Sequence, residues 1–403
     1  MHILYLHTTT EFNYLIMAET RKDIIIFGAT GYTGKVAVEE LVALIKAKGK
    51  MTWGIAGRNK SKLEEVLADV SKKTGENLQD VSVIVANVDD PESLNNMAKQ
   101  AKMIVNCVGP YRHWGEQVVK ASIENGAHHV DVSGEPQKAA EKGVYVVSAC
   151  GFDSIPAEIG VLYFLQKFGD GDVNSVETYL SSKQKGGGGG ASIHYGTWES
   201  AVYGLAHYNE LRPLRQKLFP KRLPQMSPKL KPRGAVHRNP LGSGWCLPFL
   251  GSDLSVMKRS QYHYHEVEEK RPLQIQCYLT FPSLLVALGV SLVAAVFFCL
   301  SKFSCGRTLL LKYPRFFSCG MMSHEGPTEE SRKNVSAMDP AYGFTTRCLL
   351  LCATTILNEH DKMPGNGGVY PPGAAFAKTS LMSELQTFGG MKLEVVKREQ
   401  AKL

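Results

Sequence analysis

The chain has 403 residues, which is more than one hydrophobic core usually accommodates, so its length predicts two domains. Hydrophobic residues make up 44% and charged residues 21%, which excludes an intrinsically disordered chain. The formal charge of +8 is mild and is most concentrated in the proline-rich stretch 212–238. A basic stretch can meet nucleic acid or anionic lipid, but no recognition module accompanies this one. We therefore interpret it as a solvated loop and expect no nucleic-acid partner.

The nine cysteines are scattered, with no CxxC pair and no Cys/His spacing that suits zinc. We expect neither a disulfide framework nor a metal site, and a reducing compartment. Residues 1–16 lack the basic start and the cleavage site of a secretory signal, so we expect the protein not to be secreted. Met17 is a more natural start, and we interpret 1–16 as an extension outside the fold.

From Asp23 onward, short apolar runs alternate with segments of helical periodicity. We expect strands at 23–27, 51–56, 81–88, 103–108, 128–132 and 144–148, and helices over 34–47, 61–72, 115–125 and from Pro91. Such alternation predicts an α/β fold, a doubly wound parallel sheet of the Rossmann type over residues 17–150. After Gly151 the pattern fades. We assign 151–403 to a second, α+β domain for substrate binding or dimerisation, with a strand at 173–180, a flexible glycine loop at 186–190 and a helix at 197–208.

A glycine-rich turn joins the first predicted strand to the first helix. Gly28, Gly31 and Gly34 have the GxxGxxG spacing, which permits a tight turn, a close approach of the backbone to a pyrophosphate and close helix packing. The helix N-terminus then faces the phosphates with unpaired N–H groups. The motif predicts dinucleotide binding, and the cofactor-binding residues of this turn are Gly28, Thr30, Gly31, Tyr32, Thr33 and Gly34.

The end of the second strand indicates which dinucleotide binds. NAD enzymes usually place a carboxylate there for the ribose 2′-hydroxyl, but residues 51–62 contain none. Arg58 can instead fork onto a 2′-phosphate, and Lys62 adds positive charge. The alternative is that Arg58 is a solvated residue at a helix start. We predict NADP(H), and we include Asp89, at the end of the third strand, among the cofactor-binding residues.

Polar residues follow the next three strands at the edge where a doubly wound sheet binds its ligand. Cys107, Val108, Gly109 and Pro110 are predicted to line the cofactor. Tyr111 and Arg112 are predicted to reach the substrate, together with Asp153 after the sixth strand. Asp131 ends the fifth strand at the same edge. A turn- or helix-capping role is the alternative for both aspartates.

Between Arg271 and Lys302 there is no charge, and we define 277–301 as a hydrophobic segment of the second domain. A membrane span is disfavoured because the run is near the lower length limit, and a buried helix because no polar face remains. We predict that 281–301 docks on a lipid monolayer or membrane surface. The cations that follow it are expected to meet anionic headgroups: Lys302, Arg307, Lys312 and Arg315.

Several motifs together resemble the saccharopine dehydrogenase-like oxidoreductases. They are Ile26–Gly34, Ala56–Arg58, Val105–Tyr111, Asp131–Glu135, Cys150–Pro156, Gly196–Ser200 and Pro371–Phe376. The resemblance implies a Rossmann NAD(P) domain joined to a second α/β domain, and a location on lipid droplets or in mitochondria. The chain is also similar to bacterial trans-acting enoyl reductases of glycolipid synthesis. Two stretches, 133–143 and 333–342, are shorter than the family pattern, which puts activity in doubt.

These observations predict an NADP(H)-dependent oxidoreductase that reduces an apolar, lipid-like carbonyl or enoyl substrate, with Tyr111, Arg112 and Asp153 as polar contacts. The alternative is a non-catalytic NADP(H)-binding protein attached to lipid droplets or membranes. For either function we expect a location on lipid droplets or the cytosolic face of membranes, with the mitochondrion as a further candidate. A homodimer is also expected.

Overall fold

The computed structural model describes residues 21–132, 142–168, 173–181, 193–327 and 340–395. The N-terminal extension 1–16 and the glycine loop 186–190 therefore lie outside the described residues. So do most of the two shortened stretches, 133–143 and 333–342.

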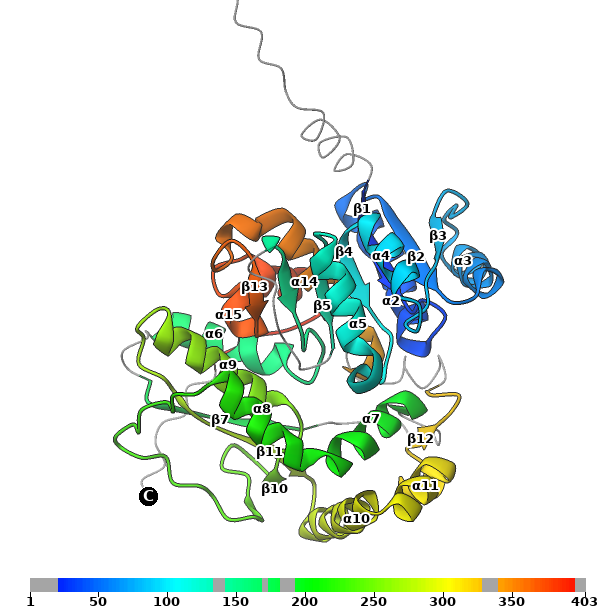
Figure 1. Ribbon diagram of the computed structural model, residues 1–403. Helices are drawn as coiled ribbons and strands as arrows, with labels where there is room; N and C mark the ends of the chain where they lie inside the picture. The colour runs from blue at the N-terminus through cyan, green and yellow to red at the C-terminus, as the bar shows by residue number, and fades with distance from the viewer. Residues whose placement is uncertain (1–20, 133–141, 169–172, 182–192, 328–339, 396–403) are drawn as a thin grey trace, which may run out of the picture.

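A seven-stranded parallel sheet forms the centre of the molecule, in the order β13-β6-β5-β4-β1-β2-β3 (Figure 1). Six of its strands lie where the sequence predicts them, which confirms the predicted Rossmann sheet. They are β1 (Lys22–Phe27), β2 (Trp53–Gly57), β3 (Ser82–Val85), β4 (Ala101–Asn106), β5 (His128–Asp131) and β6 (Tyr145–Val147).

Helices cover both faces of this sheet because each buried strand presents apolar side chains alternately to the two sides. In β1, Ile24 and Ile26 belong to one core cluster, and Ile25 and Phe27 to the other. The first cluster lies under α2 (Tyr32–Lys48) and α3 (Lys60–Thr74), and the second under α4 (Pro91–Lys99) and α5 (Tyr111–Glu124).

The C-terminal part of the chain returns to the Rossmann sheet, which was not predicted from the sequence. Strand β13 (Gly368–Tyr370) pairs in parallel with β6 at the sheet edge. Helix α14 (Thr345–Glu359) packs against α2, β4 and β5. The short helices α15 (Pro372–Phe376) and α16 (Leu381–Thr387) complete this cover, with η3 (Pro340–Phe344) and η4 (His360–Lys362) at the two ends of α14. The sheet therefore uses residues from beyond position 150, while the division into two domains at that position stays a prediction.

A second, four-stranded sheet has the order β7-β11-β10-β9. The expected strand at 173–180 is β7 (Ser175–Leu180), and it pairs in parallel with β11 (Gln274–Phe281). Antiparallel β10 (Trp245–Pro248) and β9 (His237–Arg238) follow, and α6 (Ile155–Phe168) and α9 (Asp253–Glu266) lie near it. The expected helix at 197–208 is α7 (Tyr195–Ala206). The basic stretch is mostly irregular, but it contains most of α8 (Leu211–Leu218), which follows η2 (Tyr208–Glu210).

The hydrophobic segment 277–301 divides between two elements. Its first residues belong to β11, and the rest form α10 (Leu284–Lys302), at the bottom of Figure 1. Helices α11 (Ser304–Lys312) and α12 (Pro314–Phe317) follow, and the chain then returns through β12 (Met322–Ser323), which pairs with β8 (Ile193–His194).

Candidate functional site

The glycine-rich turn has the close packing that its spacing predicts. Gly28 has a φ of 85°, and a Cβ there would lie 2.7 Å from Val108 Cγ2. A Cβ on Gly34 would clash with the carbonyl oxygen of Gly28, so only glycine lets α2 begin this close to β1. Gly31 precedes α2 and provides no side-chain cap for its first N–H groups. This turn therefore has the shape and the donors of a pyrophosphate site.

Arg58, Lys62 and Asp89 lie at the exposed rim beside this turn. Among the described residues, the Arg58 side chain has no hydrogen-bond or ion-pair partner. Asn59 caps α3 by accepting from the Lys62 N–H, so Lys62 is fixed at the helix start through its backbone. An accessible guanidinium without a carboxylate partner fits a 2′-phosphate and does not fit a bare 2′-hydroxyl.

The end of β4 lies directly against the glycine-rich turn. The Cys107 N–H donates to the Phe27 carbonyl oxygen over 2.8 Å, and the Val108 N–H donates to Asn106 Oδ1. Asn106 is fully buried, and its Nδ2 has no partner among the described residues. A buried amide donor without an acceptor is costly, so this strand end suits a polar ligand. Gly109 and Pro110 continue along the same edge.

Tyr111 and Asp131 meet at this edge. The Tyr111 hydroxyl donates to the Asn106 carbonyl oxygen over 3.0 Å, and Asp131 is paired with Asn106 in the register of β4 and β5. Asp131 is buried and lies 3.0 Å from Nε2 of buried His129. Burial, and to a lesser degree the Asp131 charge, raise the pKa of the Cys107 thiol to about 12 and the pKa of Tyr111 well above its usual value. Both groups stay protonated, so Tyr111 can donate a hydrogen bond but Cys107 is no nucleophile.

Arg112 and Asp153 are both exposed. Arg112 forms an ion pair with Glu210, the last residue of η2. The Asp153 backbone carbonyl accepts from Ser252, which precedes α9. A substrate role for Arg112 would require it to leave Glu210, whereas desolvation of the Asp153 carboxyl raises its pKa above the usual value. The roles of all three predicted catalytic residues stay predictions.

Two buried carboxyl groups near Asp153 were not predicted from the sequence. Glu158 in α6 accepts from the Ser260 hydroxyl over 2.6 Å, and burial raises its pKa to about 7. Asp253 begins α9, and its Oδ1 is buried without a partner among the described residues. Burial, followed by the charges of Asp153 and Glu158, raises its pKa to about 7. Carboxyls with such pKa values can hold a proton at neutral pH.

Gly373 lies where the motif at 371–376 packs against Glu158, which lies just after the motif at 150–156. A Cβ at this position would overlap the Glu158 carboxylate, and the Gly373 carbonyl accepts from the buried Tyr264 hydroxyl over 2.7 Å. The motifs 150–156 and 371–376 thus flank one carboxyl group. The contact between Gly373 and Glu158 forms only when α6, α9 and α15 pack together in the folded protein. The sequence therefore contains no local sign of it beyond the two motifs themselves.

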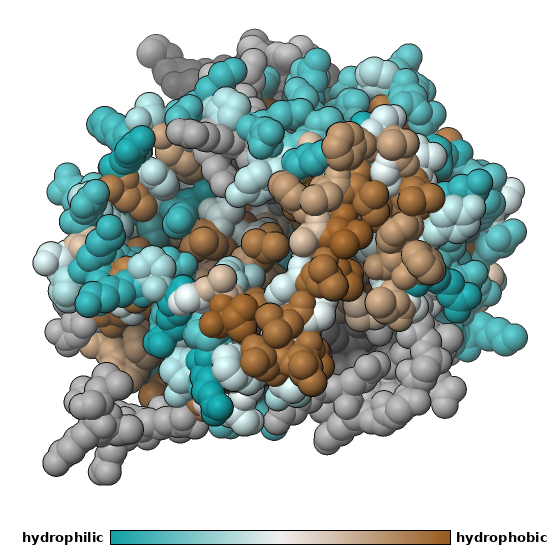
Figure 2. Space-filling view, turned by 90° about the horizontal axis from the view of Figure 1, so that it is seen from below, coloured by the Kyte–Doolittle hydropathy of each residue, from teal (hydrophilic) through white to brown (hydrophobic). Residues whose placement is uncertain are grey.

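The surface of α10 is exposed along most of its length. Only Ala287 and Ser301 are buried, while Leu285 is 81% and Leu292 67% exposed. By length and composition alone, α10 could cross a membrane. Figure 2 shows apolar side chains gathered into a broad patch on the face seen from below, where α10 lies. Exposed apolar residues of α11, α12 and their connections are Phe303, Leu309, Tyr313 and Phe316.

The cations after α10 differ from the expectation in part. Lys302 Nζ donates to the Leu205 carbonyl oxygen over 2.7 Å, and Arg307 donates to the carbonyls of Ser301 and Lys302 at the end of α10. These two side chains satisfy backbone carbonyls within the protein. Headgroup contacts of Lys312 and Arg315 stay a prediction.

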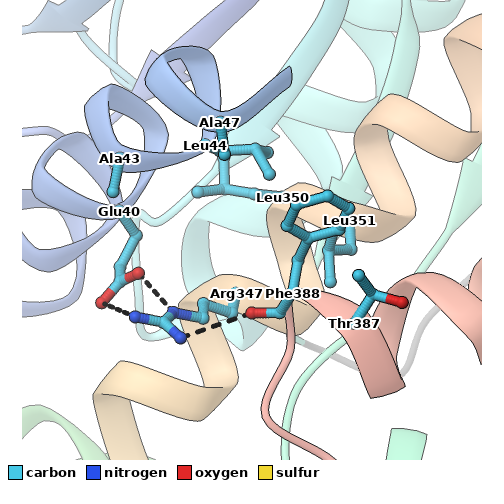
Figure 3. Close-up of a pocket in the computed structure, with 9 residues that line it drawn as sticks. All are labelled: Glu40, Ala43, Leu44, Ala47, Arg347, Leu350, Leu351, Thr387 and Phe388. Carbon is cyan, nitrogen blue, oxygen red and sulfur yellow. Dashed lines mark hydrogen bonds and ion pairs between the residues drawn. The ribbon is translucent and has the colours of Figure 1, made fainter.

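A surface cavity of about 230 Å³ lies between α2, α14 and the end of α16 (Figure 3). Arg347 Nε donates to Glu40 over 2.5 Å at its rim, and Arg347 also donates to the Phe388 carbonyl. None of the predicted site residues lines it, so it belongs to the packing of the C-terminal helices. The described part of the chain contains no group of three His, Cys, Asp or Glu residues arranged to hold a metal ion.

Comparison with known proteins shows the family of the chain. A family model described as the saccharopine dehydrogenase NADP binding domain matches residues 24–149. The mouse saccharopine dehydrogenase-like oxidoreductase is 37% identical, with 91% of this chain and 95% of the relative covered. The lipid droplet localized protein of Caenorhabditis elegans is 34% identical, with 92% and 97% covered. An Arabidopsis thaliana relative, whose name calls it a mitochondrial saccharopine dehydrogenase-like oxidoreductase, is 30% identical, with 93% and 96% covered.

A solved structure shows the same fold. Saccharopine dehydrogenase (L-Glu forming) from Saccharomyces cerevisiae superimposes with a TM-score of 0.50 at 13% identity, over 91% of this chain and 97% of the other. The family model confirms NADP(H) as the predicted cofactor, and the solved structure confirms the predicted fold.

Proposed function

The chain belongs to the saccharopine dehydrogenase-like oxidoreductases, and from this premise we propose that it reduces an apolar, lipid-like carbonyl or enoyl substrate with NADPH. The observation that carries the lipid part is the exposed apolar surface of α10. The worm relative's name, which places that protein on lipid droplets, supports the same proposal. The site of action is a lipid droplet or the cytosolic face of a membrane. The Arabidopsis relative makes the mitochondrion the alternative location.

NADPH would supply the hydride, and residues of this chain would hold it. The turn at Gly28–Gly34 receives the pyrophosphate, and Arg58 receives the 2′-phosphate. The edge formed by Gly109, Tyr111 and Asp131 then lies where a doubly wound sheet places the reacting end of its ligand. Protonated Tyr111 would donate a hydrogen bond there by turning its hydroxyl from the Asn106 carbonyl oxygen to the substrate.

The buried carboxyls provide a proton source for the reduction. Asp253 and Glu158 have pKa values of about 7, so a substantial fraction of each is protonated at neutral pH. Arg259 in α9 interacts electrostatically with both Glu158 and Asp131, so the buried carboxyls lie on the side of the strand edge. Asp153 interacts electrostatically with Asp253 and is a group through which protons could return to the site.

A cofactor titration tests the Arg58 assignment. Arg58→Ala should weaken NADPH binding by about 1–3 kcal/mol, the usual range for a charged hydrogen-bonding group. NADH binding should barely change, because it lacks the 2′-phosphate. Lys99→Ala, at the end of α4, is a matched exposed control. An equal loss of both cofactors would contradict the assignment.

Turnover distinguishes the oxidoreductase from the alternative, a non-catalytic NADP(H)-binding protein on lipid. NADPH oxidation is followed with long-chain enals, ketones and enoyl thioesters in lipid vesicles. We expect oxidation with at least one class, and loss of that activity in Tyr111→Phe with little change in NADPH affinity. Cofactor binding without oxidation of any class would favour the non-catalytic function.

A further inference from the structure

Tyr32, in the glycine-rich turn, is held by residues that lie more than 150 positions later in the chain. Its ring stacks on His194 with a centroid distance of 5.1 Å and meets the Tyr342 ring edge-on at 4.5 Å. The Tyr32 hydroxyl donates to the Pro327 carbonyl oxygen over 2.7 Å. Gly326, with a φ of 70°, leaves room for the Tyr32 ring, because a Cβ there would lie 2.9 Å from it. The first residue of α2 is therefore fixed from outside the Rossmann unit.

His194 connects this contact to α7. The His194 side-chain Nδ1 accepts from the Gly196 N–H and caps α7. The His194 backbone N–H donates to the Tyr342 hydroxyl over 2.6 Å. His194 also lies in β8, whose partner β12 has only two residues. A ladder this short is marginal by itself, so its position depends on the helices packed around it.

Helix α7 is packed in turn on the hydrophobic segment. The Trp198 indole N–H donates to the Leu310 carbonyl over 2.9 Å, and its ring lies 4.6 Å from the Phe297 ring of α10. Lys302, at the end of α10, donates to the carbonyl of Leu205 in α7. Contacts between neighbouring residues thus run from the exposed helix α10 through α7 and His194 to the cofactor turn.

We propose that His194 is a positioning residue for the NADP(H)-binding turn, and that seating α10 on a lipid surface strengthens NADP(H) binding through α7. This inference rests on the proposed function, since it requires both the cofactor and the lipid attachment. The inference adds a coupling between the cofactor turn and the lipid-facing helix α10. It also gives a role to the Gly196–Ser200 motif, which contains Trp198.

The direction of the coupling follows from the packing. One side of α10 contacts α7, β10 and α11, while its remaining surface faces water. A lipid surface would hold α10 in the position it has in this structure, with Phe297 packed on Trp198, and would disfavour conformations in which α10 and α7 separate. His194 and Tyr32 are then ordered before the cofactor arrives, so binding costs less conformational entropy. Linkage requires reciprocity, so NADPH must strengthen lipid attachment by the same factor.

The experiment measures NADPH affinity by fluorescence titration, without lipid and with vesicles of phosphatidylcholine and phosphatidylserine. We expect the vesicles to tighten NADPH binding by about fivefold, the lower end of common allosteric couplings. Vesicle flotation with and without NADPH should give the same factor. In His194→Ala the vesicles should still bind, but NADPH affinity should be lower and independent of lipid. His265→Ala, at the end of α9, is the matched control.

Tyr342→Phe provides a milder variant. It keeps the ring against Tyr32 and removes only the hydroxyl that accepts from His194, so the coupling should shrink while the fold is retained. Equal NADPH affinity with and without bound vesicles would overturn the coupling and leave the proposed function standing. Failure to bind NADPH would instead contradict the proposed function, and failure to bind vesicles would remove the lipid attachment and the coupling together.

Discussion

Helices α10 and α14 are both rich in apolar residues, yet the structure buries one and exposes the other. In α14, eleven residues are buried, including Leu349, Leu350 and Leu351, although Thr and Arg interrupt its sequence. In α10, nearly every residue is apolar, and only two are buried. The more hydrophobic helix is therefore the one left without a protein cover, which is the reverse of what burial within a single chain requires.

The two helices therefore suit different surroundings: α14 suits the protein interior, and α10 suits an apolar surface outside the chain. Helix α14 has a polar end and an apolar middle that fit between the sheet and α2. Helix α10 has no polar face, so no orientation on a protein surface satisfies it in water. An exposed apolar surface of this kind usually marks an interaction site. Matched substitutions in the two helices can therefore test whether their surroundings differ in solution.

The largest effect is expected in α14. Leu349→Ala removes a fully buried side chain and leaves a cavity in the core, so the free energy of unfolding should fall by about 2–5 kcal/mol. Leu292→Ala in α10 makes the same chemical change on an exposed side chain and should stay within about 0.5 kcal/mol of the parent. Urea denaturation of both variants checks this. Comparable losses would show that α10 is covered in solution, for example by a second copy of the chain.

The burial of α14 could not be predicted from sequence, and the reason is topological. Strands β1 to β6 were predictable because each is a local apolar run followed by a turn or helix signal. Strand β13 has only three residues, begins with Gly368, and pairs with a strand more than two hundred positions earlier. Nothing local marks it as part of the sheet, so the helix that precedes it also had no assigned place.

The candidate site shows the same division. Gly28 and Gly34 were predictable because one strand–turn–helix unit contains both, and Arg58 because it directly follows the next strand, β2. Glu158 and Asp253 were not, since their role depends on burial, which arises only when α6 and α9 pack together. The hydrogen bonds of Lys302 and Arg307 to backbone carbonyls were not predictable either, because charge alone does not show which carbonyls a side chain will reach.

The second prediction concerns the Asp253 carboxyl, which is buried between α6 and α9, and the pH dependence of stability that it causes. The Asp253 carboxyl ionises near pH 4 when unfolded, but its folded pKa is raised to about 7. The folded state therefore binds more protons between these values, and the unfolding free energy falls as pH rises through this window. A tenfold difference in proton affinity between the two states corresponds to about 1.4 kcal/mol. Asp253→Asn should raise stability by about 2 kcal/mol near pH 8 and flatten the pH profile, as thermal melts would show.

Asp361→Asn, on an exposed side chain, serves as the control and should leave the profile unchanged. If Asp253→Asn melts at the same temperature as the parent across this pH range, Asp253 ionises normally and does not hold a proton at neutral pH.

A third prediction addresses lipid attachment directly. Leu285→Ser combined with Leu292→Ser removes two of the most exposed apolar side chains of α10, so vesicle binding should weaken by about tenfold or more, given the transfer energy of a leucine. Thermal stability should not change. Leu241→Ser with Leu250→Ser replaces similarly exposed leucines outside α10 and should retain vesicle binding. Loss of attachment in the control pair alone would assign the lipid-binding surface to another part of the molecule.

The smallest effect is expected where α14 leaves a hollow against α2. The cavity in Figure 3 is lined by Ala43 and Ala47 on one side and by Leu350, Leu351 and Phe388 on the other. Ala47→Leu adds apolar volume facing these side chains at little cost in helix propensity, so it should raise the unfolding free energy by about 0.5 kcal/mol. Ala68→Leu makes the same change on the exposed side of α3, away from the cavity, and should have no effect. Equal stabilisation in both variants would mean that leucine acts through helix propensity and that the hollow stays unfilled. A gain confined to Ala47→Leu would show that the α2–α14 contact is an ordinary, improvable core, in contrast to the surface of α10.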